Sequence, residues 1–425
     1  MATWQVCAAC GQRLGELDPA TRCACGGLLE VRHDRPIEDG VSLRRLFEER
    51  WGQHDDLNLS GVWRYRELVL PTAAGQAVIH PEGNTPLLRR NSVAEWAGIP
   101  GLRLKHEGHN PTGSFKDRGM TVGVTQARRI DAAAVACAST GNTSASLAAY
   151  AAHAGLTALV FVPAGQVALG KLSQSLAYGA RTLLVRGDFD ACLRLVQEAS
   201  VRLGVYLVNS INPFRLEGQK TIVLELLHQL AWESPDWIVL PAGNLGNTAA
   251  FGKALREAHE WGLIDRVPRL AAVQAAGAGP FAAAFAEQFV RRITVKAETI
   301  ATAIKIGDPA SWDRAVRSIR ETAGVVTTVS DAEILEAKAV IDAAGVGCEP
   351  ASAASVAGAR QLTAAGVIHR DDRVVAVLTG HVLKDPGALI TYHQETEPPP
   401  GRANRPVEIE PDLREVERVL RAVSR

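Results

Sequence analysis

Lys116 is placed where its side chain could act as a nucleophile. It follows the turn-forming segment Pro111-Thr112-Gly113, and the amphipathic stretch 117–129 predicts a helix that begins near the lysine. The positive end of the helix dipole disfavours an ammonium there and favours a neutral amine. A neutral amine is the form that attacks a carbonyl carbon to give a Schiff base. An ordinary surface lysine at the start of a helix is the alternative interpretation.

A polar turn, Ser139-Thr140-Gly141-Asn142-Thr143, lies between the apolar run 133–138 and an alanine-rich stretch that predicts a helix. Hydroxyls, an amide and backbone N–H groups at a strand-to-helix turn suit an anion such as a carboxylate. Capping of the helix by Thr140, Asn142 or Thr143 is compatible with the same residues.

A glycine-rich turn, 241–248, also follows an apolar run and precedes a predicted helix. Gly243 and Gly246 let the backbone approach a ligand, and successive N–H groups at a helix start suit a phosphate dianion. The turn matches neither the Rossmann nor the Walker fingerprint, so the cofactors bound by those motifs are not supported. Thr379 adds a neutral hydroxyl directly after the apolar run 374–378, where a threonine is otherwise a common turn former.

Short apolar runs alternate with stretches of helical periodicity from about residue 102 onwards. The runs span 133–138, 157–162, 182–185, 205–208, 237–240, 270–273 and 374–378. Repeated strand–helix–strand units predict parallel sheets covered by helices on both faces, with ligands beyond the carboxyl ends of the strands. We therefore expect the lysine and the polar turns to meet at that edge.

The chain has 425 residues, more than one hydrophobic core usually organises, so we expect two lobes. Its 46 Lys and Arg residues are scattered and balanced by 46 Asp and Glu, which argues against nucleic-acid and membrane-surface partners. The longest stretch of small residues, 270–289, is too polar to span a bilayer. The first residues lack the features of a secretory signal, so we expect a cytoplasmic protein.

Four cysteines crowd the start of the chain: Cys7, Cys10, Cys23 and Cys25. Two close thiolate pairs joined by a short loop resemble a zinc ribbon, because four thiolates can converge on one tetrahedral ion. The second pair is Cys-x-Cys in place of the commoner Cys-x2-Cys, so a ribbon that has lost its metal, or a bridged pair, is an equal alternative. In either case the module is expected to be structural, since four protein ligands leave no open position for chemistry.

Over residues 82–386 the chain resembles the threonine synthase family, whose members use pyridoxal 5'-phosphate (PLP). The ten residues Asn110 to Gly119 carry most of this resemblance. It implies an α/β fold, the two-lobed parallel-sheet PLP fold type II, with an N-terminal zinc-ribbon-like module and a C-terminal arm. The expected boundaries are 1–35 for the ribbon-like module, 36–124 plus 216–392 for the large PLP-binding lobe, 125–215 for the small lobe, and 393–425 for the proline-rich arm and terminal helix.

The resemblance also implies a set of cofactor contacts. Lys116 would form the Schiff base with PLP, Asn142 would bond the ring hydroxyl oxygen, and Thr379 would meet the pyridine nitrogen. A neutral hydroxyl at that nitrogen leaves the nitrogen largely unprotonated, which makes the ring a weaker acceptor of electrons from the substrate. The cofactor phosphate would be held by Gly243, Asn244, Leu245, Gly246 and Asn247.

The substrate implied by the resemblance is O-phospho-L-homoserine, which water converts to L-threonine and phosphate by γ-elimination and β-addition. Ser139 and Thr140 would bind its carboxylate. Its phosphate would be bound by Thr143, Asn209, Ser210 and Arg215, of which Arg215 matters most because a guanidinium binds phosphate through two parallel hydrogen bonds. Lys116 is the catalytic residue expected to move the protons, and a homodimer is the expected assembly.

Two departures from the family's motifs leave other interpretations open. His381 and Val382 replace an Asn and a Gly that are common in the family, and Leu245 occupies a position that is often Ala. A titrating imidazole beside the ring is either new chemistry or a tolerated neighbour. The alternatives are a related PLP enzyme acting on another phospho-amino acid or a phosphonate, as in a cysteate synthase-like β-replacement, and a non-catalytic regulatory homologue.

Overall fold

The structure is a computed structural model that describes residues 1–165, 172–187 and 189–423. It contains two compact units, Met1–Asp385 and Pro386–Arg425. The last two residues of the expected arm, 424 and 425, lie outside the described residues. The expected lobe and arm boundaries remain predictions.

The larger sheet of the first unit has six strands in the order β12-β11-β10-β13-β5-β4. Their bounds are β4 (Leu87–Leu88), β5 (Arg103–His106), β10 (Trp237–Pro241), β11 (Arg269–Ala275), β12 (Val325–Val329) and β13 (Val374–Leu378). All neighbouring pairs are parallel except β4 with β5. Every residue of β10 and β13 is buried, as expected for central strands covered on both faces.

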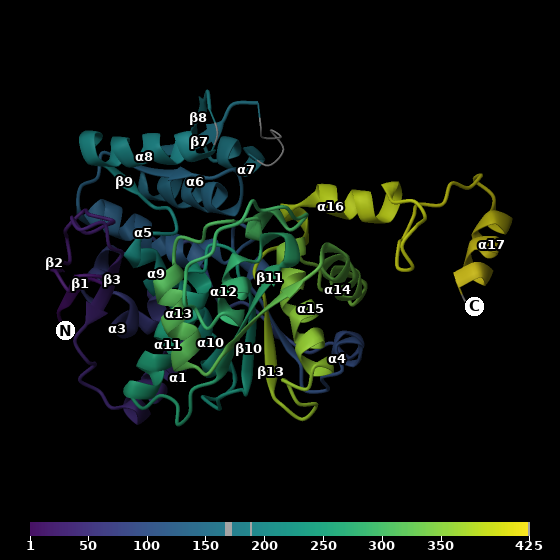
Figure 1. The fold of residues 1–425 in the computed structure, drawn as a ribbon, viewed down its shortest axis with the longest axis horizontal. Helices are drawn as coiled ribbons and strands as arrows, with labels where there is room; N and C mark the ends of the chain where they lie inside the picture. The colour runs from purple at the N-terminus through teal and green to yellow at the C-terminus, as the bar shows by residue number, and fades with distance from the viewer. Residues whose placement is uncertain (166–171, 188, 424–425) are drawn as a thin grey trace. The chain divides into compact units, whose positions relative to one another are not determined.

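The smaller sheet has four parallel strands in the order β8-β7-β6-β9. They are β6 (Ala134–Ala138), β7 (Ala158–Pro163), β8 (Arg181–Val185) and β9 (Val205–Leu207). Figure 1 shows these strands grouped with their helices, apart from β10, β11 and β13. All seven apolar runs singled out in the sequence are strands, and the predicted α/β class with parallel sheets is confirmed.

Helices cover the sheets and connect their strands. The α-helices of the first unit are α1 (Gly40–Trp51), α2 (Asp56–Leu59), α3 (Arg66–Val69), α4 (Asn91–Ala97), α5 (Lys116–Arg129), α6 (Asn142–Ala154), α7 (Ser173–Ala177), α8 (Phe189–Leu203), α9 (Pro213–Gln219), α10 (Thr221–Gln229), α11 (Gly246–Glu260), α12 (Pro280–Ala286), α13 (Trp312–Glu321), α14 (Asp331–Ala343) and α15 (Pro350–Ala364). Short 3-10 helices are η1 (Trp63–Tyr65), η2 (Pro71–Gln76), η3 (Glu107–His109), η5 (Ala276–Ala278), η6 (Thr302–Ile304) and η7 (Val382–Lys384).

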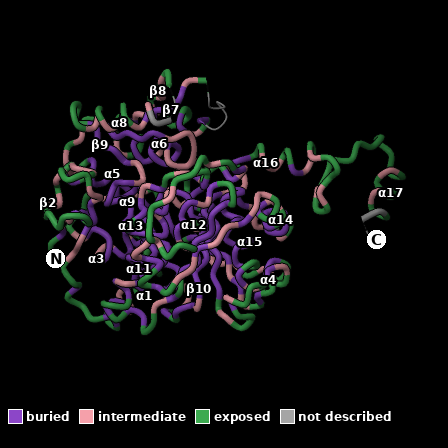
Figure 2. Tube along the Cα trace, viewed as in Figure 1, coloured by how far each residue is buried: buried purple, intermediate pink, exposed green. Residues whose placement is uncertain are grey.

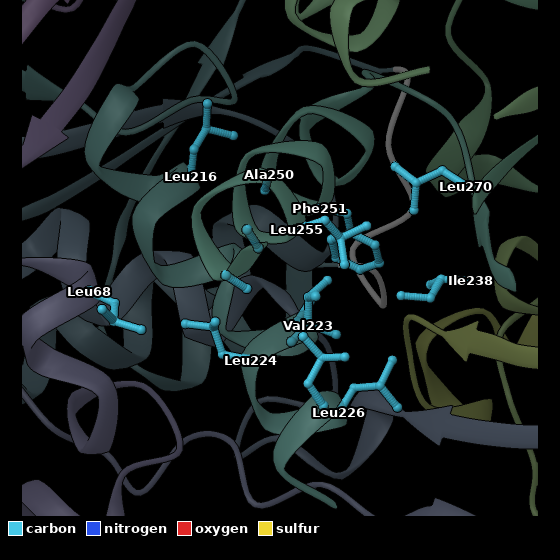
Figure 3. Packing of buried hydrophobic residues seen from close by; sticks show 14 of the residues in the cluster. Leu68, Leu216, Val223, Leu224, Leu226, Ile238, Ala250, Phe251, Leu255 and Leu270 are labelled. Carbon is cyan, nitrogen blue, oxygen red and sulfur yellow. The ribbon is translucent and has the colours of Figure 1, made fainter. Parts of the chain in front are cut away.

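The largest hydrophobic cluster packs α10 and α11 against the larger sheet. Figure 3 shows Val223 of α10 beside Phe251 of α11, with Ile238 of β10 and Leu270 of β11 on the sheet side. Burying one such side chain stabilises the fold by about 1.5–3 kcal/mol. Most residues of α11, which follows the predicted phosphate turn, are therefore buried in this core, where the trace is mostly purple (Figure 2).

The cysteine-containing module is a three-stranded antiparallel sheet in the order β2-β1-β3. Its strands are β1 (Thr3–Cys7), β2 (Arg13–Gly15) and β3 (Leu29–His33). His33 at the end of β3 lies 3.0 Å from the Glu217 carboxylate of α9, and Lys253 of α11 donates a 2.7 Å hydrogen bond to the Val31 carbonyl. The module thus contacts α9 and α11, two of the helices that carry predicted site residues.

The second unit contains α16 (Pro386–Ile390), a π-helical turn (Thr391–Glu395) and α17 (Leu413–Val423). The predicted terminal helix is present as α17. Within the described part of the chain, no helix combines the length and the apolar character that crossing a membrane requires.

Candidate active site

Lys116 is the first residue of α5, as the sequence predicted. The segment before it pairs with the end of β13: Phe115 donates a 3.0 Å hydrogen bond to the Thr379 carbonyl, and Ser114 forms a β-bridge with Gly380. Lys116 is half-buried, and its amine forms no hydrogen bond or ion pair with any described residue. The amine lies 4.1 Å from the centroid of the Phe115 ring. The segment directly before Lys116 is thus paired with the segment that carries Thr379.

The surroundings of Lys116 favour its neutral form. Burial lowers the pKa of the Lys116 amine to about 7, and the positive charge of Arg215 lowers it further, while Glu349 opposes both. A lysine in water has a pKa near 10.4 and is almost wholly protonated at neutral pH. Lys116 therefore presents a large neutral fraction at physiological pH, which is the reactive form.

A buried charge cluster holds the first turn of α5. Arg118 contacts the carboxylates of Glu107 at 2.7 Å and Glu225 at 2.8 Å, and Lys105 contacts Glu225 at 2.6 Å. All four side chains are inaccessible to solvent. Burial alone would raise the pKa of Glu225, but the charges of Arg118 and Lys105 outweigh it and hold that pKa well below its ordinary value. The cluster is internally neutralised and serves to position the lysine segment.

Asp117 fixes the turn before the lysine. Its carboxylate accepts hydrogen bonds from the Thr112 backbone at 2.7 Å, the Thr112 hydroxyl at 2.6 Å and the Ser146 hydroxyl of α6 at 2.6 Å. Asp117 is therefore a link between the lysine segment and α6, and not the solvated charge that a surface helix start would carry.

The turn 139–144 joins β6 to α6, as predicted, but its side chains do not cap the helix. Gly141 is the N-cap residue, and no side chain bonds the free N–H groups there. Ser139 accepts a 3.3 Å hydrogen bond from the Gly141 backbone, and Asn142 instead donates to Glu349 at 3.0 and 3.3 Å. Thr140 and Thr143 are half-buried. The N–H groups at the start of α6 remain available to an anion.

The turn 241–248 joins β10 to α11. Gly243 packs so closely on the Ile304 backbone that a Cβ atom would lie 3.0 Å from the Ile304 Cα. Leu245 has a φ of 62°, in the left-handed region, and turns the chain into α11 at Gly246. Asn244 accepts hydrogen bonds from the backbone of residues 310 and 311, at 2.9 Å through its side chain and at 3.2 Å through its carbonyl. These contacts hold the turn in place, and the N–H groups of the helix start that it presents could bind a phosphate.

Two side chains of this turn are buried with polar atoms that have no partner among the described residues. They are Asn247, through its amide oxygen, and Thr248, through its hydroxyl. Buried polar atoms without partners cost about 1–3 kcal/mol each, so they mark places where a ligand or water is expected to bind.

Thr379 is buried at the end of β13. Its hydroxyl lies 3.0 Å from the hydroxyl of Ser352 on α15, and Ser352 also accepts a 2.9 Å hydrogen bond from the Gly380 backbone. The Ser352 contact holds the Thr379 hydroxyl in place, and the Thr379 carbonyl accepts the hydrogen bond from Phe115 next to Lys116.

Arg215 on α9 is a buried charged residue near Lys116, and its guanidinium has few hydrogen-bond partners. One guanidinium nitrogen donates a 3.0 Å hydrogen bond to the Val208 carbonyl, while Nε and Nη2 are buried with no partner among the described residues. Burial lowers the pKa of Arg215 to about 10. Gly123 of α5 makes room, since a Cβ there would lie 3.2 Å from the Arg215 side chain. These two buried nitrogens could donate hydrogen bonds to an anion.

Asn209 and Ser210, at the end of β9, are half-buried. The Asn209 side chain exchanges two 3.0 Å hydrogen bonds with the Ala138 backbone and so extends the pairing of β6 with β9. This contact fixes the position of the Asn209 side chain and leaves its second amide N–H for a ligand.

Comparison with known proteins identifies the family. Residues 78–380 match the sequence profile described as "Pyridoxal-phosphate dependent enzyme". A threonine synthase of Methanocaldococcus jannaschii is 44% identical over 420 residues, covering 98% of this chain and 99% of the relative. The chain belongs to the threonine synthase family of PLP-dependent enzymes. A threonine synthase of Methanosarcina acetivorans is 46% identical over 92% of this chain and 94% of its own length.

A solved structure of threonine synthase from Escherichia coli has the same fold. It superposes with a TM-score of 0.71 over 99% of this chain and 100% of its own, at 18% identity. The predicted PLP fold type II is thereby confirmed for this member of the threonine synthase family.

The residues present fit the cofactor that this threonine synthase family uses. PLP requires a reactive lysine amine and a phosphate site. Lys116 offers an unpartnered amine with a lowered pKa, and the start of α11 offers free N–H groups beside the unpartnered atoms of Asn247 and Thr248. The individual contacts predicted for Asn142, Thr379 and the 243–247 turn remain predictions.

His381 caps the short helix η7. Its Nδ1 accepts a 3.2 Å hydrogen bond from the Leu383 backbone, and its own N–H donates to the Gly113 carbonyl at 2.9 Å. Burial lowers the pKa of His381, and His109 and Lys384 lower it further. These effects favour the neutral imidazole, which acts as a capping group at the start of η7.

Glu349 and Ser352, at the start of α15, were missed in the sequence. Both are buried, and they contact the predicted site residues Asn142 and Thr379. Glu349 precedes Pro350, which in sequence indicates only the start of a helix. Nothing in its local pattern shows that the carboxylate points inward.

The four N-terminal cysteines are brought together. Their sulfur atoms all lie within 4.8 Å of one another, with separations of 3.5 Å for Cys7–Cys25, 3.4 Å for Cys10–Cys25 and 3.7 Å for Cys10–Cys23. A tetrahedral zinc site with 2.3 Å bonds has sulfurs about 3.8 Å apart. Gly27 is required beside them, since a Cβ would lie 2.6 Å from the Cys7 sulfur. The cluster could hold a metal ion and is free of disulfides.

Proposed function

We propose that the protein converts O-phospho-L-homoserine and water to L-threonine and phosphate, using PLP bound at Lys116. The observation that carries this proposal is the burial of Arg215: two of its guanidinium nitrogens have no partner among the described residues, and its positive charge lowers the pKa of Lys116. A buried cation without an anion is costly unless a ligand supplies one. The substrate phosphate supplies the matching charge.

When bound, PLP withdraws electrons from the carbon atoms of the amino acid attached to it. The Lys116 amine would take the proton from Cα and pass it to the departing phosphate group, and the amine so freed would take a proton from Cβ as phosphate leaves Cγ. Lys116 would then return that proton to Cγ, water would add its hydroxyl group to Cβ and give its proton to Lys116, and Lys116 would return a proton to Cα. Lys116 is the side chain proposed for these transfers, because its pKa near 7 lets it accept and return protons at neutral pH.

The substrate is oriented by its two anionic ends. The carboxylate is proposed to lie at Ser139 and Thr140, at the open start of α6, where backbone N–H groups are free. The phosphate is proposed to lie at Arg215, with Thr143, Asn209 and Ser210 around it. These assignments place Cα to Cγ between the lysine and the arginine.

Three further properties belong to this proposal. The protein is proposed to be a homodimer located in the cytoplasm. The cysteine cluster is proposed to bind one structural zinc ion, because its sulfur separations suit a tetrahedral site.

The test uses the purified PLP-loaded protein. Incubation with O-phospho-L-homoserine should release phosphate and threonine in equal amounts, and Lys116→Ala should abolish both the absorbance band of lysine-bound PLP and turnover. Phosphate release from O-phosphoserine alone would instead support a β-replacement enzyme. A protein with no PLP band and no turnover would be a non-catalytic relative.

A further inference from the structure

Glu349 is a buried carboxylate at the edge of the candidate site with no assigned role. It is 4% exposed, at the N-cap of α15, and its backbone donates a 3.1 Å hydrogen bond to the Gly380 carbonyl. A Cβ at Gly380 would lie 2.5 Å from the Glu349 carboxyl carbon. The carboxylate therefore packs directly on the backbone that pairs with Ser114 and Phe115, immediately before Lys116.

The Glu349 carboxylate fixes the orientation of one predicted cofactor contact. Asn142 donates its amide Nδ2 to the two carboxylate oxygens at 3.0 and 3.3 Å, and among the described residues it is the one side chain that donates to them. A carboxylate only accepts hydrogen bonds, so it must face the NH2 group of the amide and not its oxygen. The second N–H of Asn142 is left for another acceptor.

Glu349 also acts on the lysine charge. Two charged groups act on Lys116: Arg215, which disfavours the ammonium, and Glu349, which favours it. The charged groups acting on Glu349 are Lys116, Lys384 and Asp385. Burial raises the pKa of Glu349, and the Asn142 hydrogen bond with the charges of Lys384 and Lys116 opposes that rise only in part.

We propose that Glu349 is a positioning residue for the reaction: its carboxylate holds the Asn142 amide toward the cofactor ring and supports the Lys116 ammonium between successive proton transfers. This inference rests on the proposed function. Lys116 must both remove and return protons, and burial together with Arg215 favours only the neutral amine. Glu349 supplies the opposing charge that lets the amine retain a proton.

The test compares Glu349→Gln with wild type, both loaded with PLP. Glutamine keeps the shape and removes the charge. The pH titration of the lysine-bound PLP absorbance band should shift down by about 1–3 pH units, as expected for loss of one nearby opposite charge. Turnover of O-phospho-L-homoserine should fall about 10²-fold, as for an impaired proton transfer, while KM changes by less than about threefold.

Two variants separate this role from a packing effect. Glu336→Gln, on the exposed face of α14, should match wild type in both measurements. Glu349→Asp keeps the charge and shortens the side chain, so its band should titrate near the wild-type pH while turnover falls. If Glu349→Gln does not fold, Glu349→Asp remains decisive, because unchanged turnover in it would overturn the proposal.

Different results would contradict the role of Glu349 and the proposed function. The band titration needs only PLP on Lys116, so it tests Glu349 even if wild type makes no threonine. An unshifted titration in Glu349→Gln, with wild-type turnover, would overturn the role of Glu349 and leave the proposed function intact.

Discussion

The Arg215 guanidinium donates a 3.0 Å hydrogen bond to the Val208 carbonyl, and its Nε and Nη2 have no partner among the described residues. Replacing Arg215 with Met removes a buried, uncompensated charge, so we expect the free energy of unfolding of the ligand-free protein to rise by about 1–4 kcal/mol. The same variant should lose about 100-fold or more in kcat/KM for O-phospho-L-homoserine, since charge-assisted hydrogen bonds contribute about 1.5–3 kcal/mol each. Urea unfolding and steady-state kinetics measure the two effects.

Arg64 provides the matched control. It is also buried, but it donates to the Asn58 carbonyl and the Asn84 side chain, so Arg64→Met should destabilise the protein. A loss of stability in Arg215→Met like that in Arg64→Met would contradict the assignment of Arg215 as an anion-binding residue.

The pH dependence of PLP binding should follow Lys116. Its pKa is lowered to about 7, so the reactive neutral amine increases as pH rises to about 7 and is nearly complete by about pH 8. We expect the rate of PLP binding to the cofactor-free protein, followed by absorbance, to rise through this range and then level off. A rate that keeps rising tenfold per pH unit up to pH 9 would instead show that Lys116 has the pKa of an ordinary lysine.

The charge cluster under Lys116 should be sensitive to loss of one member. Glu225→Gln leaves Arg118 and Lys105 with a single carboxylate, so we expect a loss of about 3–5 kcal/mol in the free energy of unfolding. The Glu225 pKa is lowered in the folded state, so its contribution is complete above about pH 4.3 and is lost as pH falls below that value. The difference between wild type and variant should therefore be constant at neutral pH and shrink in acid.

The exposed ion pair Arg373–Glu233 is the comparison for that experiment. Glu233→Gln should cost less than about 1 kcal/mol in the same urea measurement. Equal losses in the two variants would mean that the buried cluster does not stabilise the lysine segment.

Loss of the metal ion should destabilise the N-terminal module. Wild type should contain about one zinc ion per chain, and Cys23→Ser should lose it and speed hydrogen exchange in β1 and β3 by about tenfold or more. Cys192→Ser, in α8 of the smaller-sheet region, should keep its zinc. Equal zinc content in wild type and Cys23→Ser would exclude the cysteine cluster as the metal site.

Much of the fold follows from apolar periodicity, and the exceptions have physical reasons. The strand β5 was missed because its sequence, Arg-Leu-Lys-His, looks solvent-exposed. Lys105 and His106 are nevertheless buried, since Glu225 neutralises the lysine and the Gly347 carbonyl lies 2.8 Å from the histidine. The partners come from distant segments that a local pattern does not reveal. The edge strand β12 was also missed, because the two consecutive threonines at 327 and 328 interrupt its apolar pattern.

The site was predictable where it lies on turns next to strands. The segment before Lys116, the 139–144 turn, the 241–248 turn and Thr379 all lie at strand ends or helix starts, and their spacing in the sequence already showed this. Glu349 was not predictable in the same way, because its role depends on Gly380, which makes room for the carboxylate, and on Asn142, more than 200 residues away. Such contacts exist only after the sheets have formed.

The position of β13 between β10 and β5 affects how the protein matures. The strand that completes the middle of the larger sheet, and that holds Phe115 through Thr379, is made after both of its neighbours. A nascent chain lacking it has a gap between β10 and β5 and an unanchored lysine. We therefore expect stable cofactor loading to follow synthesis of β13, so that ribosome-bound fragments ending before residue 374 should not retain PLP.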